Sequence, residues 1–263
     1  MSVGGHVVLS TQKLRKEFGG VCAVNDVDLD VRHGSITALI GPNGAGKTTV
    51  FNLITGNYDA TRGRVLFTDA EHVEHSLRGR APDRITRLGI ARTFQNIRLF
   101  GDVPTLDNVK LGMHPRTDRG ALSALLRFPA AAEEREVHVA AYRYLEFVGL
   151  ASKSHELARN LPYGEQRRLE IARALALAPN LLLLDEPAAG MNPQETEDLM
   201  ALIRRIRDLG ITVLLIEHDM RLVMGISDYI VVLDHGEVIA RGLPAEVKNN
   251  PDVIRAYLGD EAI

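Results

Sequence analysis

Short apolar segments bounded by turn residues recur along this chain and predict β-strands. Residues 27–31 alternate apolar and polar side chains, which is typical of an antiparallel strand with one face in water. Residues 35–40 and 181–184 are continuous apolar runs, which indicate strands buried on both faces. The same signals predict further strands at residues 7–9, 64–67, 211–216, 229–233 and 238–239.

Helical patterns lie between these strands. Residues 48–54 and 165–178 each predict a helix. Asn192 predicts a helix start, because Pro193 follows it and Glu195 stands three residues after the cap. Strands and helices in alternation predict an α/β fold built on a mainly parallel sheet.

The middle of the chain differs from its flanks. Residues 105–158 have helical patterning and no strand, with the clearest helix at 131–150, while residues 69–90 are polar and irregular. We therefore expect a single domain, residues 1–263, with a helical subdomain inserted into an α/β core that begins with antiparallel strands. Its expected parts are a core of about residues 1–95 and 161–245, a helical subdomain of about 96–160, and a helical tail of about 246–263.

Composition narrows the class of protein. The formal net charge of the 263 residues is −3, without a basic stripe, so we expect no nucleic-acid partner. The single cysteine, Cys22, allows no internal disulfide and fits a reducing compartment. The first residues lack a signal-peptide pattern, and Pro179 interrupts the most apolar segment, which is shorter than the roughly 20 residues of a membrane helix. We expect a cytosolic protein unless a partner holds it at a membrane.

A glycine-rich segment after the strand at 35–40 fits the pattern G-x-x-x-x-G-K-[ST]. Its glycines let backbone N–H groups face a polyphosphate, and the following helix N-terminus adds positive potential. Lys47 is placed to reach the β- and γ-phosphates, and Thr48 to bind Mg²⁺. The sequence therefore predicts that the phosphates of a nucleotide bind at Gly41, Pro42, Asn43, Gly44, Ala45, Gly46, Lys47, Thr48 and Thr49.

Two acids end the buried strand at 181–184. Asp185 is expected to hold Mg²⁺, directly or through water, and Glu186 to polarise the attacking water. Taken alone, the pair is equally compatible with exposed acids at a strand end. The phosphate loop makes the catalytic interpretation the favoured one.

Residues 161–168, L-P-Y-G-E-Q-R-R, resemble the signature motif of the ABC family of ATPases, usually written LSGGQ. They stand just before the Asp185 strand, where that family carries the motif. Other family motifs follow the same order, and the resemblance covers essentially the whole chain. Gln95 matches the glutamine loop, residues 189–192 the D-loop, His218 the switch histidine, and Phe18 the aromatic residue that stacks on adenine.

This resemblance implies a fold and a mechanism. The fold is a P-loop NTPase of ABC type, and the cofactors are ATP and Mg²⁺. Glu186, His218 and Gln95 are the implied catalytic residues, and Gln95 also contacts the metal or the water. The signature residues Tyr163, Gly164 and Glu165 cover the nucleotide of a second subunit.

The implied partners are a second ABC ATPase, in a hetero- or homodimer, two transmembrane permease subunits and, indirectly, an extracytoplasmic solute-binding protein. The implied location is the cytoplasmic face of the inner membrane, held through the permeases. Phe18 is also compatible with a core position. The apolar residues Ile97, Leu99 and Phe100 fit either a permease-docking groove or a core.

The signature departs from the family pattern. Pro162 replaces the usual Ser, Tyr163 the first Gly, and Asn192 the common D-loop Asp. With the tail at 249–259, these departures resemble the larger of the two paired ATPase subunits of bacterial branched-chain amino-acid importers. One alternative is an ABC ATPase for lipopolysaccharide export. A second is a non-transport ABC ATPase of DNA repair or chromosomes, but that class needs a long coiled coil, which this sequence lacks. A third is a non-hydrolysing nucleotide-binding module, and the presence of Glu186 and His218 argues against it.

Overall fold

The computed structural model describes residues 5–113 and 130–258. The chain forms two compact units, a core unit of Met1–Arg92 with Asn180–Ile263, and a helical unit of Thr93–Pro179. The helical unit thus begins near the expected residue 96 but continues past the expected boundary at 160. It therefore includes the helix that carries the signature motif.

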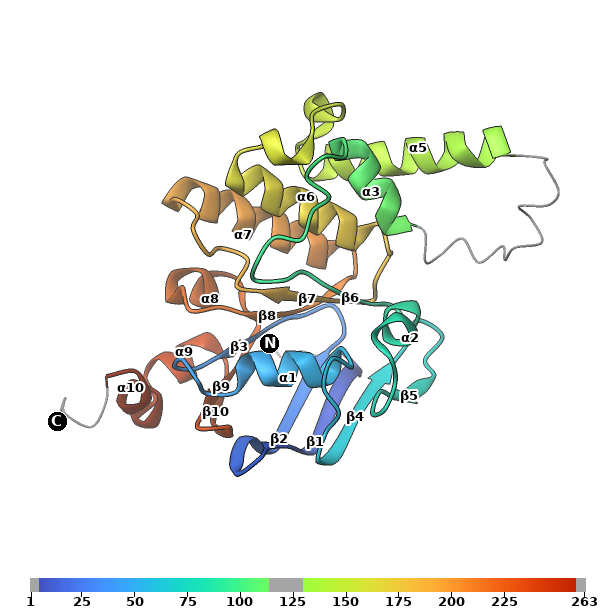
Figure 1. Ribbon diagram of the computed structural model, residues 1–263. Helices are drawn as coiled ribbons and strands as arrows, with labels where there is room; N and C mark the ends of the chain where they lie inside the picture. The colour runs from blue at the N-terminus through green and yellow to red at the C-terminus, as the bar shows by residue number, and fades with distance from the viewer. Residues whose placement is uncertain (1–4, 114–129, 259–263) are drawn as a thin grey trace. The chain divides into compact units, whose positions relative to one another are not determined.

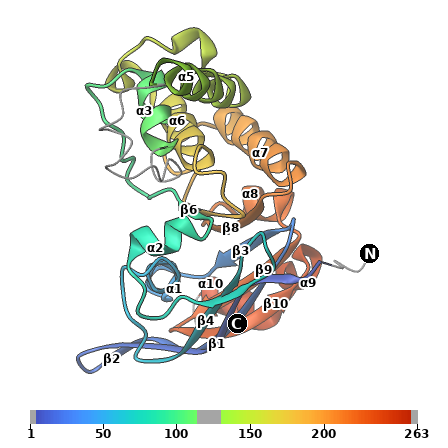
Figure 2. The same ribbon diagram turned by 90° about the vertical axis from the view of Figure 1, so that its right-hand side faces the viewer.

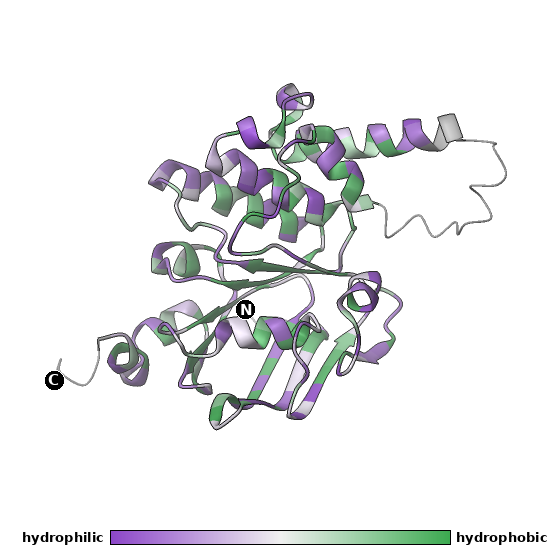
Figure 3. Cartoon of the chain, in the orientation of Figure 1, coloured by the Kyte–Doolittle hydropathy of each residue, from purple (hydrophilic) through white to green (hydrophobic). Residues whose placement is uncertain are grey.

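A six-stranded sheet forms the centre of the core unit (Figure 1). All neighbouring strands are parallel except β9 and β10, which form an antiparallel pair. The strands predicted from continuous apolar runs are fully buried, and Figure 3 shows them as hydrophobic along their length. In spatial order the strands are β10 (Glu237–Gly242), β9 (Tyr229–Asp234), β3 (Ile36–Ile40), β8 (Thr212–Ile216), β7 (Leu181–Asp185) and β6 (Ile90–Arg92).

A second, antiparallel sheet belongs to the same unit, as the alternating pattern at 27–31 predicts. Helix α1 (Lys47–Ile54) lies between the two sheets (Figure 1), where Phe51 packs in one core cluster with Leu14 of the antiparallel sheet and Leu214 of the parallel sheet. The order of this sheet is β2 (Val21–Arg32), β1 (Val7–Phe18), β4 (Arg62–Thr68) and β5 (Glu74–Ser76).

The remaining helices of the core unit follow the strands along the chain. The predicted capping box begins α7: Asn192 Oδ1 accepts from the Glu195 N–H at 3.0 Å, and Glu195 Oε2 accepts from the Asn192 N–H at 2.9 Å. The helices are α2 (Pro82–Arg87), α7 (Pro193–Asp208), α8 (Met220–Ile226), α9 (Pro244–Lys248) and α10 (Pro251–Leu258).

The expectation that residues 69–90 are irregular was wrong in part. They contain β5, α2 and the first residue of β6. Helix α2 has only six residues, and Ile85 is the one that it buries. An amphipathic period cannot be recognised in so short a segment, because one turn presents a single apolar position.

Three helices lie side by side in the helical unit, as Figures 1 and 2 both show: α3 (Thr105–Met113), α5 (Ala130–Phe147) and α6 (Tyr163–Leu175). Short 3₁₀ turns at Ala151–Lys153 and Ala158–Asn160 connect α5 to α6. Part of the predicted helical segment, residues 114–129, lies outside the described residues. Among the helices of the described ranges, none is long and apolar enough to cross a membrane.

Candidate nucleotide-binding site

The glycine-rich loop joins β3 to α1, and two of its glycines are required by close backbone contacts. Gly41 has φ +148°, and a Cβ there would lie 2.0 Å from the carbonyl oxygen of Leu233. Gly46 has φ +99°, and its Cβ would lie 2.4 Å from the carbonyl oxygen of Ala23. A side chain at either position would displace the backbone of a neighbouring strand or turn.

The N-terminus of α1 faces this loop without a capping side chain, since the cap residue is Gly46. Its first turn also carries no acidic residue. Backbone N–H groups at the start of a helix need acceptors, and the helix dipole favours an anion there. The loop and helix together form a phosphate-binding cradle.

Lys47 is folded into this cradle. Its ammonium donates to the carbonyl oxygens of Gly41 at 2.7 Å and Pro42 at 2.8 Å. Burial lowers the pKa of Lys47, and the nearby carboxylates of Glu186 and Asp185 oppose that shift. The structure therefore brings the predicted lysine and the two predicted carboxylates into one site.

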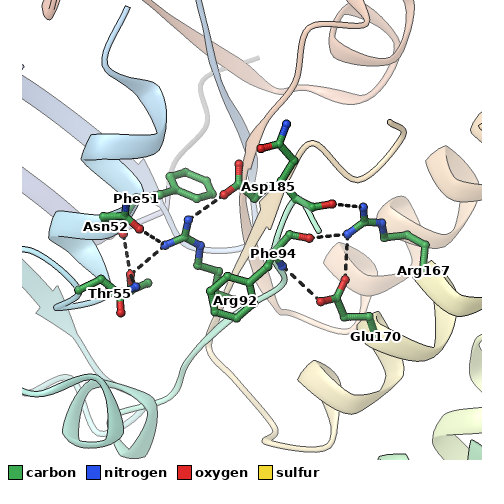
Figure 4. A network of polar contacts seen from close by, with 10 residues as sticks. Phe51, Asn52, Thr55, Arg92, Phe94, Arg167, Glu170 and Asp185 are labelled. Carbon is green, nitrogen blue, oxygen red and sulfur yellow. Dashed lines mark hydrogen bonds and ion pairs between the residues drawn. The ribbon is translucent and has the colours of Figure 1, made fainter. Parts of the chain in front are cut away.

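Asp185 ends β7 in a buried ion pair that the sequence reasoning missed. Its Oδ2 lies 2.7 Å from an Nη of Arg92, and the two side chains are only 5% and 6% exposed (Figure 4). Arg92 also donates to Asn52 Oδ1 at 2.8 Å and Thr55 Oγ1 at 3.1 Å, both from α1 or its end. Arg92 thus holds the carboxylate against the helix that begins at the phosphate loop.

Glu186 follows at a strained turn. Its φ is +46°, and its N–H donates to the carbonyl oxygen of Ile216 at 2.9 Å, which ties it to the end of β8. The Nδ1 atom of His218, from the segment after β8, lies 3.7 Å from Glu186 Oε2. The side chain of His218 is 59% exposed, so it stands at the surface of the site.

Glu217 is a second residue that sequence reasoning missed. Its buried carboxylate accepts from the backbone N–H groups of Ala188 at 2.8 Å, His218 at 3.0 Å and Asp219 at 3.2 Å. Burial raises the pKa of Glu217, and these N–H donors oppose the shift. The residue therefore ties Ala188, just before the predicted D-loop, to the backbone at His218. A charged residue directly after a continuous apolar run was the available signal.

Phe18 lies at the end of β1 and is 43% exposed, which rules out the core position. Its ring makes an edge contact with Tyr58 at a centroid distance of 5.2 Å, and the ammonium of Lys16 lies 4.8 Å from its centroid. Phe18 and Tyr58 thus form a small aromatic surface in the core unit.

The C-terminal helix α10 also contacts the phosphate loop. Burial raises the pKa of Tyr257, and a hydrogen bond with the backbone of Gly41 opposes that shift. A cavity of about 630 Å³ lies between the loop and α10. It is lined by Pro42, Asn43, Gly44, Ala45, Asp234, His235, Ile239, Asp252, Arg255 and Ala256.

The remaining predicted residues lie in the helical unit. Pro162 caps α6 without a side-chain hydrogen bond, Tyr163 is exposed and Gly164 is buried. Glu165 pairs with Lys153 at 2.6 Å. The side chain of Gln95 is exposed. The segment with Ile97, Leu99 and Phe100 is half-buried or exposed, so these three residues do not form a core.

The glycine-rich loop that cradles Lys47 follows β3, and β8, the strand beside β3, also neighbours β7, which leads to Glu186. This is the arrangement of P-loop nucleoside triphosphatases. Within that class the family is shown by sequence. Residues 24–189 match the model of the ABC transporter family, and this chain belongs to that family of ATP-hydrolysing subunits.

Curated relatives extend over nearly the full length. The chain is 48% identical over 255 residues to the high-affinity branched-chain amino acid transport ATP-binding protein LivG of Salmonella typhimurium, covering 96% of this chain and 98% of the relative. It is 47% identical, with the same coverage, to the corresponding protein BraF of Pseudomonas aeruginosa. Residues 237–263 match a second family model, described as branched-chain amino acid ATP-binding cassette transporter.

Solved structures agree with the fold. A nucleotide-free ATP-binding cassette from an ABC transporter has a TM-score of 0.82 and 32% identity, and the match covers 97% of this chain and all 100% of that one. A dimeric ATP-binding cassette in a post-hydrolysis state with ADP and phosphate has a TM-score of 0.73 and 25% identity, covering 90% and 98%.

Lys47→Ala should abolish the stabilisation of the protein by ATP, because the mutation removes the cation from the phosphate cradle. A ligand at a concentration of 100 times its dissociation constant stabilises a protein by about 2.7 kcal/mol. Thermal unfolding with and without Mg-ATP measures this stabilisation. Lys110→Ala, which removes a lysine paired with Asp107 on α3, is the control and should keep the shift. An unchanged shift in Lys47→Ala would place nucleotide binding elsewhere.

Arg92→Met should lower the free energy of unfolding by about 3–5 kcal/mol, since it leaves the Asp185 carboxylate buried without its cation. The control is Arg221→Met, which breaks an exposed pair with Glu197 and should cost about 1 kcal/mol or less. Chemical denaturation of both variants checks the difference. Similar losses in the two variants would show that the Arg92 pair is not energetically distinct.

Proposed function

We propose that this chain hydrolyses ATP to drive the import of branched-chain amino acids by an ABC transporter. The observation that carries the proposal is the match of residues 237–263 to the branched-chain family, joined to the intact phosphate site of the core unit. Helix α10, within that matched segment, lines with Asp252, Arg255 and Ala256 the same cavity as residues 42–45 of the phosphate loop. The subfamily-specific tail is therefore part of the surroundings of the nucleotide site.

Magnesium fits the donors that the core unit supplies. The described residues contain no cluster of three or more His, Cys, Asp or Glu side chains that could hold a metal. Mg²⁺ commonly binds through one or two protein oxygens together with substrate phosphates and water. Thr48 and Asp185 are the proposed ligands in the core unit, and the metal would neutralise phosphate charge in hydrolysis. The family resemblance adds Gln95 as a proposed ligand.

The proposed catalytic roles come from the family resemblance, and the geometry near the cradle supports them. Glu186 holds the attacking water as general base, and His218, whose Nδ1 lies 3.7 Å from Glu186 Oε2, steadies that carboxylate and contacts the γ-phosphate. Phe18 stacks on adenine at the exposed aromatic surface that it forms with Tyr58. Lys47 binds the β- and γ-phosphates.

A second ABC ATPase completes each site in this proposal. The N-terminus of α6, with Tyr163, Gly164 and Glu165, covers the nucleotide bound by the partner. Two permease subunits hold the pair at the cytoplasmic face of the inner membrane, and a solute-binding protein delivers the amino acid on the other side. No nucleic acid takes part. The dimeric cassette among the similar structures supports this pairing.

In a transporter reconstituted with its permeases and solute-binding protein, leucine, isoleucine or valine should stimulate ATP hydrolysis, whereas lysine should not. Glu186→Gln should reduce the stimulated rate by about 10²–10⁴-fold and keep the ATP-dependent thermal shift. Glu197→Gln, an exposed change on α7, should leave the rate as it is. Stimulation by another class of solute would contradict the assigned substrate, and a near-normal rate in Glu186→Gln would contradict the role of that residue.

The two ATP sites of a heterodimeric transporter should be unequal. Pro162 offers neither a hydroxyl nor an N–H to the γ-phosphate that this chain covers, and a hydrogen bond to a charged group contributes about 1.5–3 kcal/mol. Lys47→Ala in this chain should therefore reduce ATPase activity more than the equivalent mutation in a companion with an intact LSGG-type motif. A larger loss from the companion's mutation, or a homodimer with identical sites, would refute the asymmetry.

A further inference from the structure

Among the described residues of the helical unit, the most deeply buried ion pair is formed by two residues to which the proposed function gives no role. Arg167 and Glu170, one turn apart on α6, are paired at 2.8 Å, with side chains 0% and 2% exposed. Arg167 is the largest fully buried side chain among the described residues. Its Nε atom has no hydrogen-bond partner there, which adds to the desolvation cost of burying the charge.

The pair binds the backbone of the glutamine loop from two sides (Figure 4). Arg167 donates through one Nη to the carbonyl oxygen of Phe94 at 2.6 Å and through the other to that of Gln95 at 2.7 Å. Glu170 Oε1 accepts from the N–H groups of Phe94 at 3.4 Å and Arg98 at 3.3 Å. The backbone on both sides of the Gln95 side chain is therefore held by α6.

The same arginine reaches the signature motif. The Nη that contacts the Gln95 carbonyl lies 3.2 Å from the phenol oxygen of Tyr163, the first residue of α6. Tyr163 stands where the family usually has Gly, and its ring lies beneath the guanidinium, with its centroid 5.9 Å from Cζ. One nitrogen thus links the glutamine loop to the start of the signature helix.

Stability alone is a poor explanation for this arrangement. A well-packed apolar pair in place of a buried ion pair is often neutral or stabilising by about 1–4 kcal/mol. What an apolar pair cannot do is bind four backbone groups of the loop and a phenol at once. The arrangement instead fixes the positions of Gln95 and Tyr163 relative to each other. A catalytic site needs its residues to be placed to within a fraction of an ångström.

We propose that Arg167 and Glu170 are positioning residues that join the glutamine loop to the signature helix, so that Gln95 and Tyr163 move as one body. The inference rests on the proposed function, in which Gln95 serves this chain's nucleotide and Tyr163 the partner's. It adds a physical link between those two sites through a single helix. The proposed role of Glu186 in hydrolysis is unchanged.

The test is the double variant Arg167→Met with Glu170→Leu, which removes both charges and leaves none buried alone. In the complete transporter, kcat should fall about ten- to a hundredfold, as a misplacement of about 1 Å does. KM for ATP should stay within about twofold, because the phosphate loop belongs to the core unit and binding is retained. Hydrogen exchange at the amides of Phe94 and Arg98 should accelerate at least about tenfold through local opening, without a fall in melting temperature.

Two further variants make the result specific. Tyr163→Phe keeps the exposed ring and removes the phenol, so kcat should fall by less than in the double variant while exchange at Phe94 stays unchanged. Lys110→Met is the control, since Lys110 pairs with Asp107 on α3 of the same unit. It should preserve both kcat and exchange.

The outcomes separate this inference from the proposed function. A wild-type complex without ATPase activity would refute the proposed function. Normal activity in the wild type and in Lys110→Met, with unchanged kcat or unchanged exchange in the double variant, would overturn the positioning role alone. A wild-type kcat in Tyr163→Phe would show that the contact with Tyr163 does not link the glutamine loop to the signature helix. A fall in melting temperature of the double variant equal to that of Arg167→Met alone would show that the pair serves folding.

Discussion

The close approach of the phosphate loop to its neighbours is the constraint on which the rest of the core unit depends. Gly41 leaves no room for a Cβ beside Leu233, and Gly46 leaves none beside Ala23. The N–H of Gly236 donates to Ala45 at 3.1 Å, which adds the β9–β10 turn to the same contact. The loop is shaped by both sheets at once, so the cradle exists only when the whole core unit is folded.

Buried charge is arranged around that cradle in a consistent way. Lys47, Asp185, Arg92 and Glu217 all lie within one residue of an end of a helix or strand, and each contacts a backbone group or an opposite charge. Charges buried without partners would be prohibitively costly. Partnered in this way, they hold carboxylates and backbone amides in fixed places, and preorganised electrostatics of this kind stabilise the charge that develops in phosphoryl transfer.

Much of the fold could be predicted because its signals are local. The continuous runs at 35–40 and 181–184 became fully buried parallel strands, and Asn192 with Glu195 formed the predicted capping box. The residues of the loop motif are likewise consecutive in the sequence, so Lys47 lies where the pattern predicts. Local patterns also explain the miss at α2, which is too short to show a period.

The residues that were missed are those whose partners are remote in sequence. Arg92 pairs with Asp185 because β6 lies beside β7 in the sheet, and the sequence of neither strand indicates that they are neighbours. Arg167 and Glu170 contact residues more than 70 positions away, and along α6 they look like an ordinary surface pair three residues apart. Pairing across a sheet or between a helix and a loop is decided by tertiary packing, which a single sequence does not display.

The C-terminal helix is part of the phosphate site, although it lies at the opposite end of the chain from the phosphate loop. Asp252, Arg255 and Ala256 of α10 line one cavity together with loop residues 42–45, so the last helix is one wall of the phosphate site. Two segments more than two hundred residues apart in the chain therefore line the same site. A chimaera of two related transporters should therefore keep a working cassette when two crossovers exchange a segment between the loop and the final helix, so that both come from the same parent.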